Sequence, residues 1–171
     1  LTGHYSTSSV VLVVMVRTPV QGAMKHAVLE RVDDLEWRLR QVAGVETTQS
    51  VASLARQTAV AMNEGNPRWY ELQPNQGALN AASARAPRSL VNADFSLLQV
   101  QVYLADHKAQ TLRRVTAAVE AFARENDSAE ATFLLAAGNA GIEAATNIVV
   151  HDASRAMLYW VYAAVIVLCL V

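Results

Sequence analysis

Apolar positions along the chain recur with two spacings, and these predict strands and helices in alternation. Residues 9–16 form a continuous β-branched run, which is typical of a central strand buried on both faces. Residues 95–104 alternate instead, with Leu98, Val100, Val102 and Leu104 on one side and polar residues on the other. Residues 45–51 alternate more weakly and are more polar, so we expect an edge strand there. Residues 131–136 are predicted as the last strand.

Two amphipathic helices are predicted from apolar residues that step by three and four positions. The first covers residues 24–42, where Gly44 follows as a natural stop. Asp106 is a plausible N-cap for the second. The expected apolar stripes are Val28, Val32, Leu35, Leu39 and Val42 in the first helix, and Leu112, Val115, Val119 and Phe122 in the second.

The middle of the chain, residues 52–94, is the least regular part and contains most of the prolines. Residues 52–62 fit a helix, which the sequence NEGNP at 63–67 should end. We interpret 52–94 as an insertion between two halves. The expected inward positions of its helix are Leu54, Ala55, Thr58, Ala59 and Met62.

Two strand–helix–strand halves separated by an insertion predict an α+β domain of the ferredoxin-like, split βαβ type over residues 1–139. The crossover rule places both helices on one face of a four-stranded sheet. The other face would carry Gln99, Gln101 and Tyr103, either in water or against a neighbouring domain. Residues 140–171 are expected to form a connecting helix that continues into the membrane.

The last 16 residues, 156–171, carry no charge. As a helix they would rise roughly 24 Å, whereas a bilayer core of ~30 Å needs about 20 apolar residues. We interpret them as a transmembrane helix cut off by the end of the sequence. A charge followed by aromatic rings is the order expected at membrane entry, and the candidate residues are Arg155, Met157, Tyr159, Trp160 and Tyr162.

Composition narrows the function classes. The net charge is −1, so no field favours nucleic acid. The only cysteine, Cys169, lies in the apolar tail, which excludes a disulfide framework and a zinc site of paired cysteines. The four histidines are scattered, and we expect neither a metal nor a cofactor. Asp33, Asp34 and Glu36 are predicted to form a solvated helix face, balanced by nearby arginines.

Several phrases resemble exporters of the resistance–nodulation–division (RND) superfamily, of the MMPL-like type. They are LAAGNAGIEAATN at 135–147, MLYWVYAAV at 157–165, DHKA at 106–109 and NEGN at 63–66. The resemblance implies a porter domain on the periplasmic side of a bacterial inner membrane. Its partners would be the membrane, the remainder of the transporter chain and a hydrophobic or amphipathic substrate. The acidic residues of the family's proton relay lie in membrane helices outside this sequence, so this chain alone should not transport.

Two features carry both a functional and a plain structural interpretation. Trp69 and Tyr70 could line a substrate path, or they could pack the insertion onto the sheet. Gly138 and Gly141 could form a hinge that transmits motion between membrane and domain, or simply allow a tight turn.

Three function classes remain open. The favoured one is the porter domain of a proton-driven exporter, and the alternative is a free-standing, tail-anchored ferredoxin-like binding module. The third is a hydrolase, because Arg17 and the loop with Gly22 faintly resemble the phosphate site of acylphosphatase. His26 stands where that family has a second arginine, which disfavours an enzyme.

Overall fold

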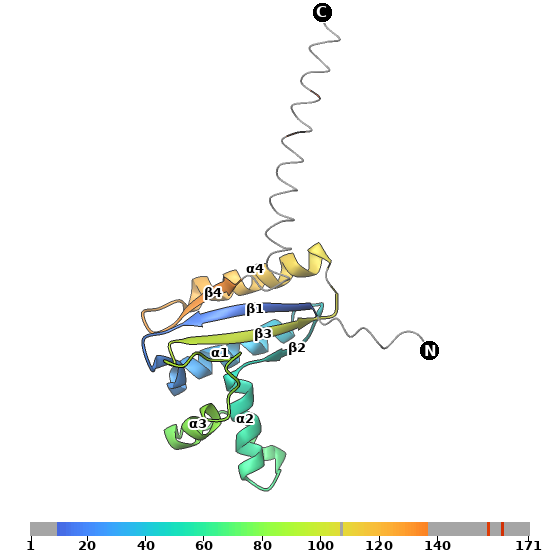
Figure 1. The fold of residues 1–171 in the computed structure, drawn as a ribbon. Coiled ribbons are helices and arrows are strands. Elements are labelled where there is room, and N and C mark those ends of the chain that lie inside the picture. The colour runs from blue at the N-terminus through green and yellow to red at the C-terminus, as the bar shows by residue number, and fades with distance from the viewer. Residues whose placement is uncertain (1–9, 107, 137–156, 158–161, 163–171) are drawn as a thin grey trace, which may run out of the picture.

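The computed structural model describes residues 10–106, 108–136, 157 and 162. Within them the chain is α+β, with a four-stranded antiparallel sheet and four α-helices (Figure 1). The elements are β1 (Val10–Arg17), α1 (His26–Arg40), β2 (Val45–Gln49), α2 (Val51–Met62), α3 (Gln76–Ser83), β3 (Leu97–Leu104), α4 (Ala109–Asn126) and β4 (Thr132–Ala136), with short 3₁₀ turns η1 (Gly22–Met24) and η2 (Pro67–Trp69).

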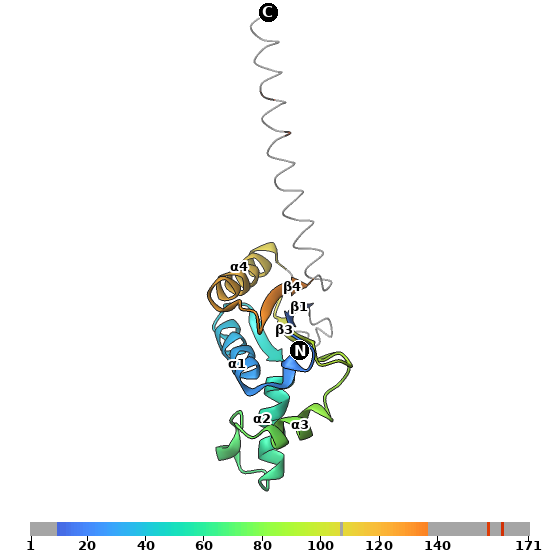
Figure 2. The ribbon, with the colours of Figure 1, turned by 90° about the vertical axis from the view of Figure 1, so that its left-hand side faces the viewer.

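The strand order in the sheet is β2-β3-β1-β4, and every neighbouring pair is antiparallel. Because β1 and β2 are each antiparallel to β3, they run in the same direction with β3 between them. The polar strand β2 lies at an edge, as its composition predicts. Helices α1 and α4 lie side by side on one face of the sheet (Figure 2).

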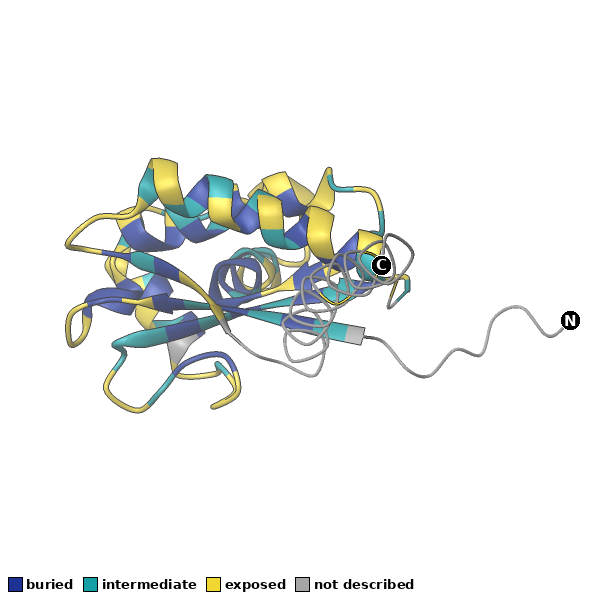
Figure 3. Cartoon of the chain, turned by 90° about the horizontal axis from the view of Figure 1, so that it is seen from above, coloured by how far each residue is buried: buried dark blue, intermediate teal, exposed yellow. Residues whose placement is uncertain are grey.

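The core fills the space between this sheet face and the two helices. One residue in two along β1 and β3 is buried there, and Phe133 of β4 meets Phe122 of α4 edge-to-face at 5.0 Å between ring centroids. The predicted stripe of α4 is fully buried, as is that of α1 except for the half-buried Val42. Figure 3 shows α4 with its buried residues towards the sheet and its exposed residues outward.

The prediction that the first strand is buried on both faces is wrong. Leu12, Val14 and Val16 are fully buried, whereas Val11, Val13 and Met15 on the opposite face are only half-buried. No described helix covers that second face. The β-branched run therefore predicted the strand correctly but not the burial of its second face. Gln99, Gln101 and Tyr103 lie on the same half-buried face, as predicted.

The predicted second strand ends early because a capping box starts a helix. The Ser50 hydroxyl accepts hydrogen bonds from the backbone N–H groups of Ala52 (3.0 Å) and Ser53 (3.3 Å), and the Ser53 hydroxyl accepts one from the Ser50 N–H (2.9 Å). Helix α2 therefore begins at Val51, directly after β2. Of its predicted inward positions, Ala55, Thr58 and Ala59 are buried, but Met62 is 61% exposed.

Asp106 does not occupy the N-cap position of α4, which belongs to Lys108. Its carboxylate instead accepts a hydrogen bond from the Lys108 N–H at 3.1 Å and pairs with Lys108 Nζ at 3.0 Å. Hydrogen bonds with the side chains of Thr111 and Lys108 lower the pKa of Asp106 to about 2. The acidic side chain still supports the helix start, from two residues farther upstream.

Candidate functional site

The helical insertion between β2 and β3 contains the residues that the sequence singled out as a substrate path. Its helices α2 and α3 pack against each other, and η2 lies against α2. Asn66 fixes η2 by accepting a hydrogen bond from the Arg68 N–H at 3.0 Å, with Pro67 in the first position of the turn. Asn75 starts α3 by accepting one from the Gly77 N–H at 2.8 Å.

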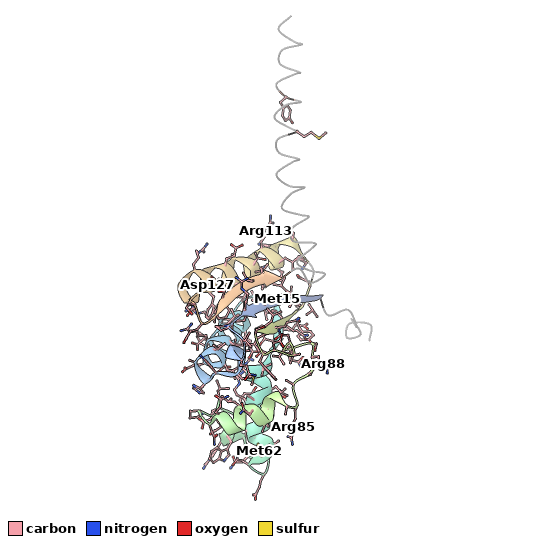
Figure 4. The ribbon with its side chains drawn as sticks, turned by 60° about the vertical axis from the view of Figure 1, so that its left-hand side comes forward. Met15, Met62, Arg85, Arg88, Arg113 and Asp127 are labelled. Carbon is pink, nitrogen blue, oxygen red and sulfur yellow. The ribbon has the colours of Figure 1, made fainter. Side chains whose placement is uncertain are left out.

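A cleft of about 290 Å³ lies between α2, α3 and the segment around η2, and we call it the insertion cleft. Its buried walls are apolar or weakly polar, and Trp69 (42% exposed) and Met62 (61% exposed) contribute to its more exposed part. Figure 4 places Met62 at the end of α2 farthest from the sheet. The lining residues are Ala55, Thr58, Ala59, Met62, Asn63, Trp69, Gln73, Asn75, Ala78 and Leu79.

Tyr70 does not line the insertion cleft but anchors the segment next to it. The guanidinium of Arg56 in α2 lies over the Tyr70 ring, 5.1 Å from the centroid. Such a cation–π contact contributes about 1 kcal/mol. The structure thus separates the two aromatic residues: Trp69 faces the cleft, and Tyr70 holds the turn against α2.

Arg56 also belongs to a partly buried ionic cluster that the sequence did not reveal. Its Nη1 contacts Asp33 Oδ1, and its Nη2 lies 3.3 Å from Glu36 Oε2, while Arg40 Nη2 lies 3.6 Å from the same oxygen. Glu36 is fully buried, so the prediction of a solvated carboxylate face is wrong for this residue. The charged partners of Glu36 are Arg40 of α1 and Arg56 of α2. The spacing of residues within α1 could not predict the contact with α2.

Burial raises the pKa of Glu36 above its usual value, although Arg40 and Arg56 oppose the shift. The Ser50 hydroxyl also lowers the pKa, yet Oε1 of Glu36 makes no hydrogen bond of good geometry in the described part of the chain. Burial raises the pKa of Asp33 as well, against the same two arginines. The cluster ties the insertion to α1 rather than forming an open site.

The loop after β1 does not form a phosphate cradle. The backbone N–H groups of Gln21, Gly22 and Ala23 donate to backbone carbonyls at 3.0, 2.8 and 3.0 Å, so none of them is free to hold an anion. His26 lies 3.9 Å from Glu30, and Arg17 is an exposed strand end. Among the described residues, no group of three His, Cys, Asp or Glu side chains could hold a metal ion.

The predicted membrane-entry and hinge residues fall largely outside the described residues. Met157 and Tyr162 are helical, with 71% and 63% of their surface exposed. Arg155, Tyr159, Trp160, Gly138 and Gly141 are not described. In the portion of the chain that is described, no helix combines the length and apolar character needed to cross a bilayer.

Comparison of the sequence with protein-family models finds no match, and comparison with curated proteins finds no significant relative.

Proposed function

We propose that this chain is the extracytoplasmic porter domain of a proton-driven RND-type exporter, of the MMPL-like type. In this proposal the domain is ferredoxin-like, and residues 140–171 connect it to the bacterial inner membrane through a long helix. The domain contacts a hydrophobic or amphipathic substrate and does not transport alone. The remainder of the transporter supplies the membrane helices and the proton path.

The observation that carries the proposal is the strand order β2-β3-β1-β4 with α1 and α4 on one face. The first and second strands point the same way with the third between them, and this geometry supports the split βαβ arrangement that the pattern of apolar positions predicts. The sheet alone does not identify a function, because this arrangement serves many activities. The tail, with its aromatic residues followed by an aliphatic run, adds the membrane component.

Location in the cell is the first test. Cys169 is the only cysteine among these 171 residues. Once Cys169 and any cysteine in the remainder of the protein are changed to serine, Arg88→Cys adds one thiol, at an exposed position of the loop before β3 (Figure 4). In intact cells that make the whole protein containing this chain, a membrane-impermeant maleimide should label the introduced thiol. Labelling that requires permeabilisation of the inner membrane would refute the proposal. The cysteine-free protein without Arg88→Cys is the matched control.

Transport is the second test. Deleting the gene should raise the steady-state accumulation of a hydrophobic dye to the level seen when a protonophore collapses the proton gradient, and the intact gene should restore low accumulation. A deletion strain that accumulates no more dye than its parent would argue against an exporter.

A second candidate is a tail-anchored ferredoxin-like binding module. The sheet face that none of the described helices covers favours it, because Val11, Val13 and Met15 are half-buried and Leu134 is 39% exposed there. This candidate predicts normal dye accumulation in the deletion strain together with partner binding that Met15→Glu abolishes.

A further inference from the structure

The insertion cleft has uncharged walls. None of its ten lining residues is ionisable. Its deepest positions are Ala55, Ala59 and Leu79, all at most 7% exposed. The side chain of Trp69 adds a large aromatic surface that is 42% exposed. The volume of about 290 Å³ is at the small end of the range of about 300–1,000 Å³ for ligand pockets.

Three amides on the cleft wall keep hydrogen-bonding atoms for a ligand. Asn63 donates from Nδ2 to the Ala59 carbonyl at 2.7 Å, and its Oδ1 has no partner within the described residues. Gln73 donates from Nε2 to Glu71 at 3.1 Å, which leaves its Oε1 as an acceptor. Asn75 accepts from Gly77 through Oδ1, so its Nδ2 remains a donor. The wall therefore offers both acceptors and donors around an apolar floor.

Charge selects among possible ligands. A cation or an anion entering the cleft would lose hydration without meeting a countercharge on the wall, which costs free energy. Arg56, the one charged residue of α2, is already engaged with Asp33, Glu36 and the Tyr70 ring. The Glu71 carboxylate does not line the cleft and accepts the hydrogen bond from Gln73. A neutral ligand meets no such penalty, and a carboxamide-like group can satisfy acceptors and donors together.

We infer that the insertion cleft binds a small, uncharged amphipathic molecule, with a flat apolar part against Trp69 and a neutral hydrogen-bonding group at the amides of Asn63, Gln73 and Asn75. The inference rests on the proposed function in one respect, namely that the bound molecule is a substrate for export. Binding itself can be measured without transport.

The test uses three naphthalene ligands that share one ring and differ in charge: 2-naphthamide, 2-naphthoate and 2-naphthylmethylammonium. The full chain in detergent carries 5-fluorotryptophan at Trp37, Trp69 and Trp160. Fluorine NMR then reports on each indole separately, and Trp69→Phe assigns the relevant signal. Trp37 is 64% exposed on α1 and does not line the cleft, so its signal is the internal control.

We expect the dissociation constant of 2-naphthamide, measured from the shift of the Trp69 signal, to be at least about tenfold lower than that of either charged ligand. A free-energy cost of about 1.4 kcal/mol for placing an unpaired charge in the cleft gives that ratio. The half-buried Ala78 lines the cleft, and Ala78→Phe should fill it and abolish the shift. Ala81→Phe, at a half-buried position of the same helix outside the cleft, should leave binding intact.

Three results would each overturn the inference. Equal binding of the three ligands would refute the selection for a neutral molecule, and no shift at Trp69, or one that survives Ala78→Phe, would refute the site. Failure of the proposed function has a different signature: selective binding at Trp69 together with normal dye accumulation in the deletion strain would keep the site and remove its role in export.

Discussion

At the scale of single residues, Gly44 shows how closely the helices approach the sheet. It precedes β2 with φ of 101°, a left-handed backbone that side chains rarely tolerate. A Cβ at this position would lie only 2.5 Å from Cγ2 of Thr111 in α4. Gly44 thus serves both the turn and the contact of that turn with α4.

Replacing this glycine separates the two roles. Gly44→Ala should lower the free energy of unfolding by about 2 kcal/mol, because backbone strain and a steric clash add. Gly65→Ala is the matched control, since its φ is 77° but nothing lies within 4 Å of the added Cβ. It should cost about 1 kcal/mol from strain alone. Urea denaturation measures both, and equal losses would show that Thr111 does not limit the site.

Glu36 is the residue whose environment departs furthest from its sequence pattern. A fully buried carboxylate with a raised pKa binds its proton more tightly in the folded state than in the unfolded state. Its contribution to stability is therefore complete below the ordinary pKa of 4.5 and is lost as the pH rises through the folded-state pKa.

Glu36→Gln removes this titration and keeps a side chain of similar shape. The stability of the wild type relative to Glu36→Gln should fall as the pH increases from 4 towards 7. Urea midpoints measured across this range give the difference directly. A difference that grows in favour of the wild type would mean that Arg40 and Arg56 outweigh burial, and would contradict the raised pKa.

At the scale of elements, periodicity predicted every strand and helix of the sheet layer to within a few residues. It succeeds there because one face of each element is buried and the apolar spacing records that face. It erred for β1, since the half-buried face of that strand carries Val11, Val13 and Met15 in place of polar residues. It also extended the second strand to residue 51, two residues too far, because it did not recognise the two serines that cap α2.

The candidate site was predicted less completely than the fold. Trp69 and Tyr70 were identified because aromatic residues are conspicuous in an irregular segment. Their different roles depend on Arg56, whose contacts with Asp33 and Glu36 join residues 20 or more positions apart. Spacing within one helix contains no information about such pairs. The polar walls of the insertion cleft likewise come from segments that only the folded chain brings together.

At the scale of the whole molecule, the buried apolar residues that the structure describes, apart from Ala59, form one continuous core. Every buried apolar residue that the structure describes lies between Leu12 and Phe133. A chain that lacks residues 156–171 should therefore remain folded and soluble, with near-ultraviolet ellipticity like that of the full chain. Aggregation with loss of that ellipticity would instead make the tail part of the core. Phe122→Ala in the shortened chain is the control for core damage and should cost about 3–5 kcal/mol.

The placement of the helical insertion has a consequence for how such a domain can diversify. Strands β2 and β3 are antiparallel neighbours, so the polypeptide leaves and re-enters the sheet at the same end. Lengthening the loops between the intervening helices would change neither strand order nor register, because added loop length costs little free energy. The sheet layer and the base of the insertion, which Arg56 fixes to α1, are therefore a constant frame. The loops of the insertion can vary around this frame and alter what is bound.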